Sequence, residues 1–296
     1  LFEQIASERD YYGFLAADRI DQPYQMNHSS APADEAMIDQ LLARDDFIRA
    51  HELFRTGLFS RGRIEWARAL RRLDEAQRAQ ASIVAHRWGW HSRAISTASG
   101  NGFDDDLTLR FPTPWKSSFE RLSDGASLNT TWVYGIARSE SLFMPDVSSS
   151  AGAVGLMQLM PATGAETAKK ANIAYKGRHS LVQPETNITL GTRYLAEMMA
   201  RFDNNQVMAT AAYNAGPHRV QRWLPKGEAL PADAWVESVP YRETRRYVRR
   251  VLAAQTVFDW RLGASDTRLS DRMPPVPTRI ASHRSKQANE TRTAGL

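Results

Sequence analysis

Apolar residues recur at three- and four-residue intervals through most of this 296-residue chain, and this spacing constrains its fold more than any other feature. Such spacing gathers apolar side chains on one face of an α-helix, whereas a strand requires alternation at every second residue. Alternation of that kind is scarce, so we predict a mainly α protein. The expected helices cover residues 33–42, 47–54, 64–73, 74–88, 118–124, 130–141, 162–171, 184–202, 206–214, 217–223 and 241–262.

Short breaks separate the helices of the first third. We expect one turn at Thr56 and Gly57 and another from Ser60 to Gly62. The segment 50–70 resembles one helix–turn–helix unit of a repeat, and such units bury their apolar faces only by stacking on neighbours. The sequence therefore predicts the end of an α-solenoid, with an ordinary helical bundle as the alternative.

Glycine and aspartate residues at 100–106, followed by Pro112 and Pro114, interrupt the helical pattern and predict a domain boundary. We expect a helical linker over residues 1–112, a second helical domain over 113–265 and a basic tail over 266–296. The last segment has no periodicity, which is typical of a flexible tail or an extended strap. The chain opens as if within an amphipathic helix, so we expect that its natural N-terminus and any targeting signal have been removed.

The charge and composition of the chain narrow the classes of function. The net charge is +5, and only six of the 38 basic residues are lysines. Arginine suits carboxylate and phosphate partners, so nucleic acid and an anionic polymer are both candidates. Cysteine is absent, which excludes disulfides and thiolate metal sites. No apolar run reaches the roughly 18 residues that a membrane span requires.

Several common catalytic arrangements are missing from the sequence. It contains no HExxH motif, and His86 and His91 lie five residues apart, a spacing that does not share a helical face. There is no G-x-S-x-G elbow, no P-loop and no dinucleotide-binding glycine pattern. We therefore expect neither a metal nor a cofactor.

Glu140 stands out because its neighbourhood is apolar. The helix expected over residues 130–141 places it in the last turn, just before Leu142, Phe143 and Pro145. A helix C-terminus disfavours negative charge, and apolar neighbours penalise the ionised form. Both effects keep the carboxyl protonated, as a general acid near neutral pH requires. The alternative is a solvated surface glutamate.

The residues that follow Glu140 suit a flat ligand. Residues 148–155 are small and permit close approach to the backbone, and Gln158 lies between two pairs of apolar residues. Carbohydrate sites combine an apolar wall with an amide of this kind. The alternative is a core segment in which Gln158 turns to a backbone carbonyl.

Three segments carry a resemblance to a known family. They are ESLF with SSAGAVGLMQLMP (140–143 and 149–161), AAYNAGP (211–217) and ESVPYRETRRYV (237–248). In this order they resemble the signatures of the soluble lytic transglycosylases, which cleave peptidoglycan with a goose-type lysozyme-like domain. The segment ERDYYGFLAADRIDQPY (8–24) also resembles the superhelical linker of the long periplasmic members.

The resemblance implies a lysozyme-like catalytic domain over 113–265 and makes Glu140 the single catalytic acid and base. It would protonate the glycosidic oxygen of N-acetylmuramic acid, with help from the substrate's acetamido group, and then accept the C6 hydroxyl proton to give a 1,6-anhydro end. The implied substrate-binding residues are Ser149, Gln158, Met160, Tyr213, Asn214 and Glu243. For Tyr213 the resemblance directs the hydroxyl toward the reacting centre; for Glu243 an ion pair with Arg242 or Arg246 is the alternative.

The resemblance also implies partners and a compartment. The implied partners are peptidoglycan strands with their stem peptides, together with possible proteins of cell-wall synthesis or remodelling. The implied compartment is the periplasm of a Gram-negative bacterium, and the expected oligomeric state is a monomer. Nucleic acid is not expected. Two other functions stay open: a lysozyme-type hydrolase of the same bond, and a non-catalytic helical scaffold that binds through its arginines. The arginines of residues 242–250 are also consistent with a solvated helix face, and Trp66, Trp88 and Trp90 with a core.

Overall fold

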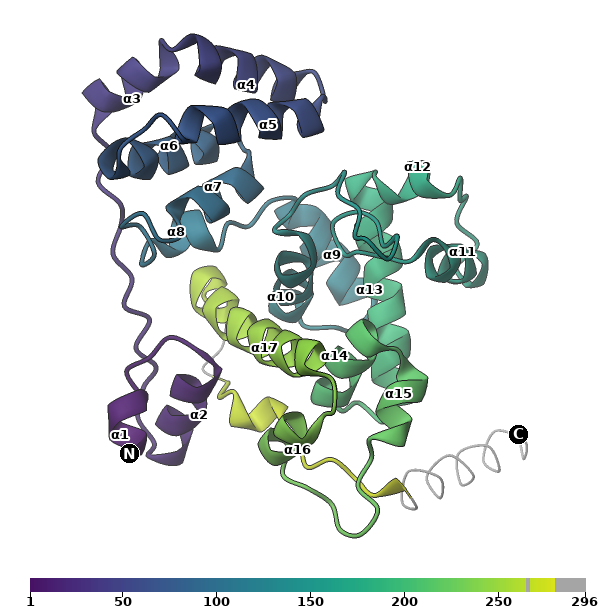
Figure 1. The fold of residues 1–296 in the computed structure, drawn as a ribbon. Helices are drawn as coiled ribbons and strands as arrows, with labels where there is room; N and C mark the ends of the chain where they lie inside the picture. The colour runs from purple at the N-terminus through teal and green to yellow at the C-terminus, as the bar shows by residue number, and fades with distance from the viewer. Residues whose placement is uncertain (265–266, 280–296) are drawn as a thin grey trace.

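The computed structural model describes residues 1–264 and 267–279 (Figure 1). Within these residues every regular element is a helix, and extended segments pair only through isolated bridges, so the predicted mainly α class is confirmed. Helices α1 to α8 are Phe2–Ile5, Tyr11–Arg19, Glu35–Leu42, Asp45–Arg55, Phe59–Leu70, Glu75–Arg87, His91–Ala98 and Leu107–Arg110. Helices α9 to α17 are Lys116–Gly125, Thr130–Ser141, Pro161–Lys170, Arg178–Leu181, Pro184–Arg201, Gln206–Ala215, Pro217–Arg222, Ala232–Ser238 and Arg242–Leu262, and the 3₁₀ helix η1 is Ser270–Arg272.

Capping residues set the ends of several helices. Asn129 accepts a hydrogen bond from the Thr131 amide at 2.8 Å and starts α10, which covers the residues expected from the sequence. Asp74 and Gln77 form a reciprocal capping box at the start of α6. The turn expected from Ser60 to Gly62 is wrong, because these residues lie inside α5.

The place of Gly62 explains that error. A Cβ there would lie 3.2 Å from the ring of Trp90 and 3.4 Å from the Ala50 carbonyl oxygen. The glycine therefore serves close helix packing rather than a turn, and its sequence neighbourhood does not distinguish the two. The turn at Thr56 and Gly57 is confirmed, with Gly57 at a φ of 76°.

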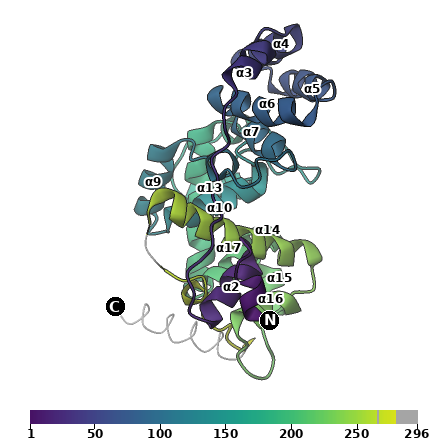
Figure 2. The ribbon, with the colours of Figure 1, turned by 90° about the vertical axis from the view of Figure 1, so that its left-hand side faces the viewer.

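Helices α3 to α7 form an arm that stacks helix on helix at the top of Figures 1 and 2. Their apolar faces share one core cluster, which includes Phe47, Trp66 and Trp90. The Trp66 ring nitrogen donates to the Thr97 hydroxyl at 3.1 Å. Trp66 and Trp90 are buried, as expected for core residues, whereas Trp88 is partly buried against the same cluster.

A second and larger core joins α9 to α17. Its centre is the contact between α10 and α17, which lie against each other in the middle of both views (Figures 1 and 2). A Cβ on Gly135 of α10 would lie 2.9 Å from the carbonyl oxygen of Val251 on α17. Glycine at this position lets the two backbones approach closely, and this approach sets the distance between the ends of the two helices.

The first two helices pack on this second core, although they belong to the predicted linker. Tyr11, Phe14 and Leu15 of α2 are buried members of that cluster. From α2 the chain runs in extended form along the side of the molecule to α3 (Figures 1 and 2). The N-terminal helices and the arm are therefore joined by residues 21–34 rather than by shared packing.

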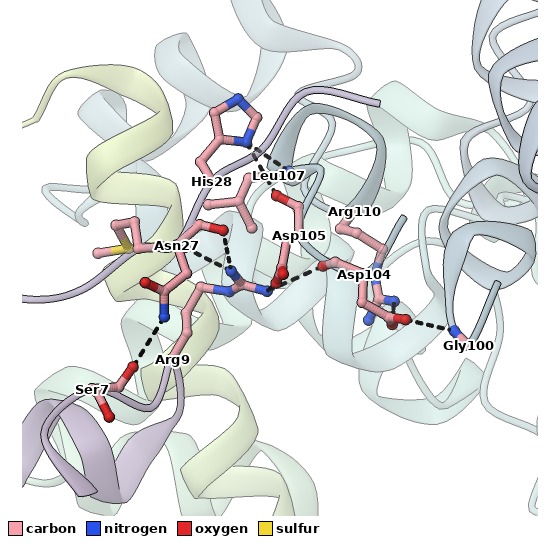
Figure 3. A network of polar contacts seen from close by, with 10 residues as sticks. Ser7, Arg9, Asn27, His28, Gly100, Asp104, Asp105, Leu107 and Arg110 are labelled. Carbon is pink, nitrogen blue, oxygen red and sulfur yellow. Dashed lines mark hydrogen bonds and ion pairs between the residues drawn. The ribbon is translucent and has the colours of Figure 1, made fainter. Parts of the chain in front are cut away.

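A polar network fastens this extended segment to the loop before α8 (Figure 3). Arg9 donates to the Met26 carbonyl at 2.6 Å and to the Asp104 carbonyl at 3.1 Å, and it forms an ion pair with Asp105 at 2.9 Å. The Asn27 amide donates to the Ser7 carbonyl at 3.0 Å. The Arg9 guanidinium thus links three separate parts of the chain.

Residues 267–279 form the strap that the sequence offered as one of two alternatives. Leu269 and Val276 are fully buried, and Val276 pairs with Leu230 through a backbone bridge. Arg268 forms an ion pair with Asp21 at 3.0 Å, and Arg272 forms one with Asp259 at 2.5 Å. This part of the predicted tail is therefore packed on the core, while residues 280–296 lie outside the described residues.

The close contact at Gly135 generates a stability prediction. Replacing Gly135 by alanine forces its Cβ against a backbone oxygen that cannot rotate away, so we expect the free energy of unfolding to fall by about 1–3 kcal/mol in urea titrations. Gly125→Ala is the matched control, because a Cβ there meets nothing within 4 Å, and its stability should be unchanged or raised by up to about 1 kcal/mol. Equal effects of the two substitutions would contradict the account.

Candidate active site

Glu140 lies in the last turn of α10, as the sequence predicts, and its side chain is half-buried between α10 and α17. The hydroxyl of Tyr247, a buried residue of α17, donates to Oε1 of Glu140 at 2.6 Å. The alternative of a solvated surface glutamate is therefore wrong, because the carboxyl group is enclosed and held by a neighbouring helix.

The enclosure changes the acidity of this group. Burial raises the pKa of Glu140 to about 7, and the negative charge of Glu243 acts in the same direction. The hydrogen bond from Tyr247 and the positive charge of Arg250 lower the pKa, but they do not offset the loss of water. Near neutral pH the group is thus divided between its protonated and ionised forms, which suits an acid that also serves as a base.

The backbone turns sharply after Glu140. Leu142 and Phe143 both adopt left-handed conformations, with φ of 50° and 64°, which non-glycine residues seldom do. Phe143 is buried and makes edge contacts with the rings of Tyr134 and Phe258. Packing therefore stabilises a strained turn that carries the chain from α10 into the loop beside Glu140.

That loop, residues 144–160, is fastened by buried side chains. Asn187 of α13 is fully buried, donates to the carbonyls of Val154 and Leu181 at 3.0 and 2.8 Å, and accepts from the Met157 amide at 2.7 Å. The Ser141 hydroxyl, next to Glu140, donates to the Leu156 carbonyl at 2.7 Å. The loop is therefore a fixed wall, and its backbone groups find partners where no strand supplies them.

Gln158 lies in this wall and uses its amide nitrogen locally. The Nε2 atom donates to the carbonyls of Gly155 and Val147 at 2.9 and 3.2 Å, which agrees with the alternative in which the side chain turns to the backbone. Gly155 itself has a φ of 85°, and a Cβ there would lie 2.2 Å from the Leu181 carbonyl oxygen. The small residues of this loop therefore serve close packing, at least at Gly155.

Ser149 lies within the same loop, Met160 ends it, and both residues are exposed. The Ser149 hydroxyl accepts from the Ala153 amide at 3.0 Å, which shapes the tip of the loop. Met160 precedes α11 and has 43% of its surface exposed. Both remain available to a ligand.

Tyr213 and Asn214 end α14 beside the site. The Tyr213 hydroxyl donates to the Met157 carbonyl at 2.8 Å. Burial, followed by the charge of Glu140, raises the pKa of Tyr213 well above the usual value. Its hydrogen bond is thus made to the loop and not to Glu140. Asn214 accepts from the Thr244 hydroxyl at 2.7 Å and so connects α14 to α17.

Glu243 and Asp146 are the acids to compare with Glu140. Glu243 is exposed in the first turn of α17 and forms no ion pair among the described residues, so the alternative of a pair with Arg242 or Arg246 is wrong. Asp146 is held by Arg63 of the arm through two hydrogen bonds of 2.9 and 2.8 Å. That ion pair joins the arm to the loop that follows Glu140.

No group of three or more histidine, aspartate or glutamate residues that could hold a metal occurs in residues 1–264 and 267–279. In the same residues no helix combines the length and the apolar character that crossing a membrane requires.

Tyr247, Asn187 and Arg63 were not anticipated as site residues. Tyr247 lies within the motif of residues 237–248, but its helical spacing indicates only a core position. Asn187 lies inside a long helix, where an amide gives no sign of its role until the loop packs on it. Arg63 reaches the site from another part of the fold, and no local pattern reveals such a partner.

The described residues form a helical body with a half-buried glutamate at the junction of two central helices and a fixed loop beside it. This combination defines the lysozyme-like class. The transglycosylase SLT domain matches residues 117–236, and the soluble lytic murein transglycosylase L domain matches residues 40–107. The chain therefore carries both a transglycosylase SLT domain and a soluble lytic murein transglycosylase L domain.

Curated and solved relatives extend over most of the chain. The soluble lytic murein transglycosylases of Salmonella typhimurium and Escherichia coli K12 are each 34% identical over 273 residues, which is 92% and 91% of this chain and 42% of each relative. The structure of an inactive Glu-to-Gln mutant of lytic transglycosylase Slt from Pseudomonas aeruginosa is 37% identical, with a TM-score of 0.84 over 90% of this chain and 44% of that one. The 70-kDa soluble lytic transglycosylase of Escherichia coli is 33% identical, with a TM-score of 0.83 over 92% of this chain and 43% of that one.

This chain therefore spans less than half the length of the relatives that it matches. The similarity covers both the arm and the helices around Glu140, and the lysozyme-like fold predicted from the sequence is confirmed.

The raised pKa of Glu140 predicts how stability depends on pH. Between its unfolded value of 4.5 and about 7, the folded protein retains a proton that the unfolded chain has released, so the free energy of unfolding falls as pH rises. Glu140→Gln has no proton to lose at this position. Its free energy of unfolding minus that of wild type should therefore rise by roughly 2–3 kcal/mol between pH 4.5 and pH 8. Urea unfolding across this range measures the difference. Glu228→Gln, at an exposed loop position, should retain the pH dependence of wild type, and a flat difference for Glu140→Gln would contradict the assigned burial effect.

Proposed function

We propose that this protein is a peptidoglycan lytic transglycosylase that cleaves the β-1,4 bond between N-acetylmuramic acid and N-acetylglucosamine and leaves a 1,6-anhydro end. The observation that carries the proposal is the enclosed carboxyl of Glu140, whose pKa lies at about 7. The relatives named above are lytic transglycosylases, and the inactive Glu-to-Gln mutant among them supports catalysis by a glutamate.

The proposed reaction moves one proton through Glu140 twice. Protonated Glu140 donates its proton to the glycosidic oxygen as the C1–O bond breaks, and the substrate's 2-acetamido oxygen stabilises the positive centre at C1. The ionised carboxylate then takes the proton of the C6 hydroxyl, whose oxygen bonds to C1. Water is not consumed, and Glu140 is again protonated at the end.

Three features of the site favour this scheme. The hydrogen bond from Tyr247 supports the ionised form, while burial supports the protonated form, so that neither step requires a large change in proton affinity. Asp146 is engaged by Arg63 and is unsuited to act as a second carboxylate. The fixed loop before α11 gives the glycan a rigid wall.

We further propose that Ser149, Gln158 and Met160 line the sugar groove. The Gln158 amide nitrogen is occupied by backbone carbonyls, which leaves its oxygen for a sugar amide or hydroxyl. Met160 offers an exposed apolar face to a sugar ring. Tyr213 and Asn214 shape the wall through their contacts with Met157 and Thr244, and Glu243 lies at the rim, where it could meet the stem peptide.

The second candidate is a lysozyme-type hydrolase. It is favoured by one observation: the charge of Glu243 adds, in small part, to the rise that burial causes in the pKa of Glu140, as a second carboxylate nearby would. A two-carboxylate mechanism would release a reducing sugar end. A non-catalytic arginine-rich scaffold predicts instead that Glu140→Gln leaves function unchanged and that DNA affinity falls steeply with salt.

The place and organisation of the protein follow as parts of the same proposal. The relatives from Salmonella typhimurium and Escherichia coli support the periplasm of a Gram-negative bacterium as the proposed compartment, with wall-remodelling proteins as possible neighbours. We propose that residues 1–112 serve as the helical linker, 113–265 as the catalytic domain and 266–296 as a basic extension. Gly100, Pro112 and Pro114 mark the first of these boundaries.

Mass spectrometry of the muropeptides released from intact sacculi tests the function. Wild type should release products lighter by one water than reducing-end muropeptides, Glu140→Gln should lower the rate by at least about 100-fold, and Glu228→Gln should match wild type. Reducing-end products alone would establish the hydrolase. Undiminished release by Glu140→Gln would overturn the assignment of the acid.

A further inference from the structure

A cleft of about 330 Å³ lies where α2 meets α10 and α17, and four arginines are among its lining residues. The residues that matter are Arg9, Tyr12, Phe111, Arg138, Arg249 and Arg250. Figure 1 shows α2 beside the central α17, so the cleft lies at the junction of the N-terminal helices and the catalytic core.

Two of the four arginines are already engaged by carboxylates. Arg9 forms an ion pair with Asp105 at 2.9 Å, and Arg249 forms one with Glu237 at 3.4 Å. In contrast, none of the ion pairs among residues 1–264 and 267–279 includes the other two arginines, Arg138 and Arg250. The cleft therefore holds two guanidiniums that form no ion pair in the described part of the protein.

Arg138 is the more unusual of the two. It is only 8% exposed, its Nε donates to the Arg110 carbonyl at 2.9 Å, and its guanidinium carbon lies 3.9 Å from the centre of the Phe111 ring. Burial, together with the charges of Arg110 and Arg250, lowers the pKa of Arg138 to about 9. A buried guanidinium without a counter-charge is costly, and fixed arginine forks of this kind match a carboxylate.

Arg250 connects the cleft to Glu140. It is exposed, donates to the Ser139 carbonyl at 3.2 Å, and its charge lowers the pKa of Glu140. The cleft also contains the hydroxyl-bearing Tyr11, whose oxygen is buried and has no hydrogen-bond partner among the described residues. A ligand in the cleft would therefore lie within electrostatic reach of the acid.

Asp10 is the one acidic residue in the lining of the cleft. Its Oδ1 accepts from the Gly13 amide at 2.8 Å and so caps α2. It forms no ion pair with Arg138 or Arg250 in the described part of the chain. Its carboxylate thus caps the start of the helix and pairs with neither guanidinium.

We propose that this cleft is a binding site for a carboxylate group, held between Arg138 and Arg250 with Tyr12 and Phe111 as its walls. Under the proposed function this carboxylate belongs to the stem peptide of the bound glycan, so the inference rests on the proposed function. A carboxylate there would neutralise the buried charge and place the peptide beside the catalytic groove.

The test compares turnover of two glycan substrates, one with its stem peptides and one from which an amidase has removed them. Arg250→Gln and Arg138→Met should lower kcat/KM on the peptide-bearing strands about tenfold more than on the bare strands. The comparison is a ratio because Arg250→Gln also acts on Glu140, and that effect is common to both substrates. Arg193→Gln, an exposed arginine of α13, removes the same charge and should leave the ratio unchanged.

The outcomes separate the site from the proposed function. Absence of turnover by wild type on either substrate would refute the function, whereas a normal wild-type rate with equal losses on both substrates would refute the stem-peptide source. Because Arg138 is buried, its variant is first checked for folding by circular dichroism, and the exposed Arg250 variant decides the question if Arg138→Met does not fold.

A calorimetric titration with citrate distinguishes a free carboxylate from a peptide-borne one. In one outcome, wild type and Arg193→Gln bind citrate, Arg250→Gln does not, and turnover shows no stem-dependent change. This outcome would support a carboxylate site but assign it to a free anion. No citrate binding together with no stem-dependent change would overturn the proposal.

Discussion

The backbone of α10 approaches that of α17 at Gly135, where a Cβ would lie 2.9 Å from the Val251 carbonyl oxygen. This one contact brings the end of α10 against the second turn of α17, so that Tyr247 reaches Glu140 at 2.6 Å. The same approach removes water from the carboxyl group and raises its pKa to about 7. Packing of two helices thus determines the acidity of a side chain, and the acidity determines what the site can catalyse.

The rest of the site fixes what lies around that carboxyl. Asn187 and Ser141 hold the loop that follows α10 through buried hydrogen bonds to its backbone. Arg63 reaches from the arm to Asp146 in the same loop. The arm is therefore more than a spacer, because it contributes an ion pair to the wall of the groove. Arg138 of α10 lines the cleft proposed to bind a carboxylate, and it forms no ion pair within residues 1–264 and 267–279.

The helices around the site could be predicted because their signals are local. Asn129 and the apolar spacing after it give α10 its bounds, and Pro184 and Pro217 start α13 and α15 as a first-turn proline should. Glu140 could be singled out for the same reason, since its apolar neighbours are adjacent in the sequence. Tyr247, Asn187 and Arg63 could not, because each acts through a contact with a distant segment. Gly62 misled the prediction, since a glycine required for close packing looks the same in sequence as one required for a turn.

The most direct test of the account is the titration of the Glu140 side-chain carboxyl in the wild-type protein. Carbon-13 NMR of glutamate-labelled protein, with the Glu140 signal assigned by its loss in Glu140→Gln, reports the ionisation of this group alone. The account predicts a midpoint near pH 7, with the carboxyl protonated at pH 5. A midpoint at or below the ordinary glutamate value of about 4.3 would contradict it, because Glu140 would then be ionised at neutral pH and could not serve as the acid.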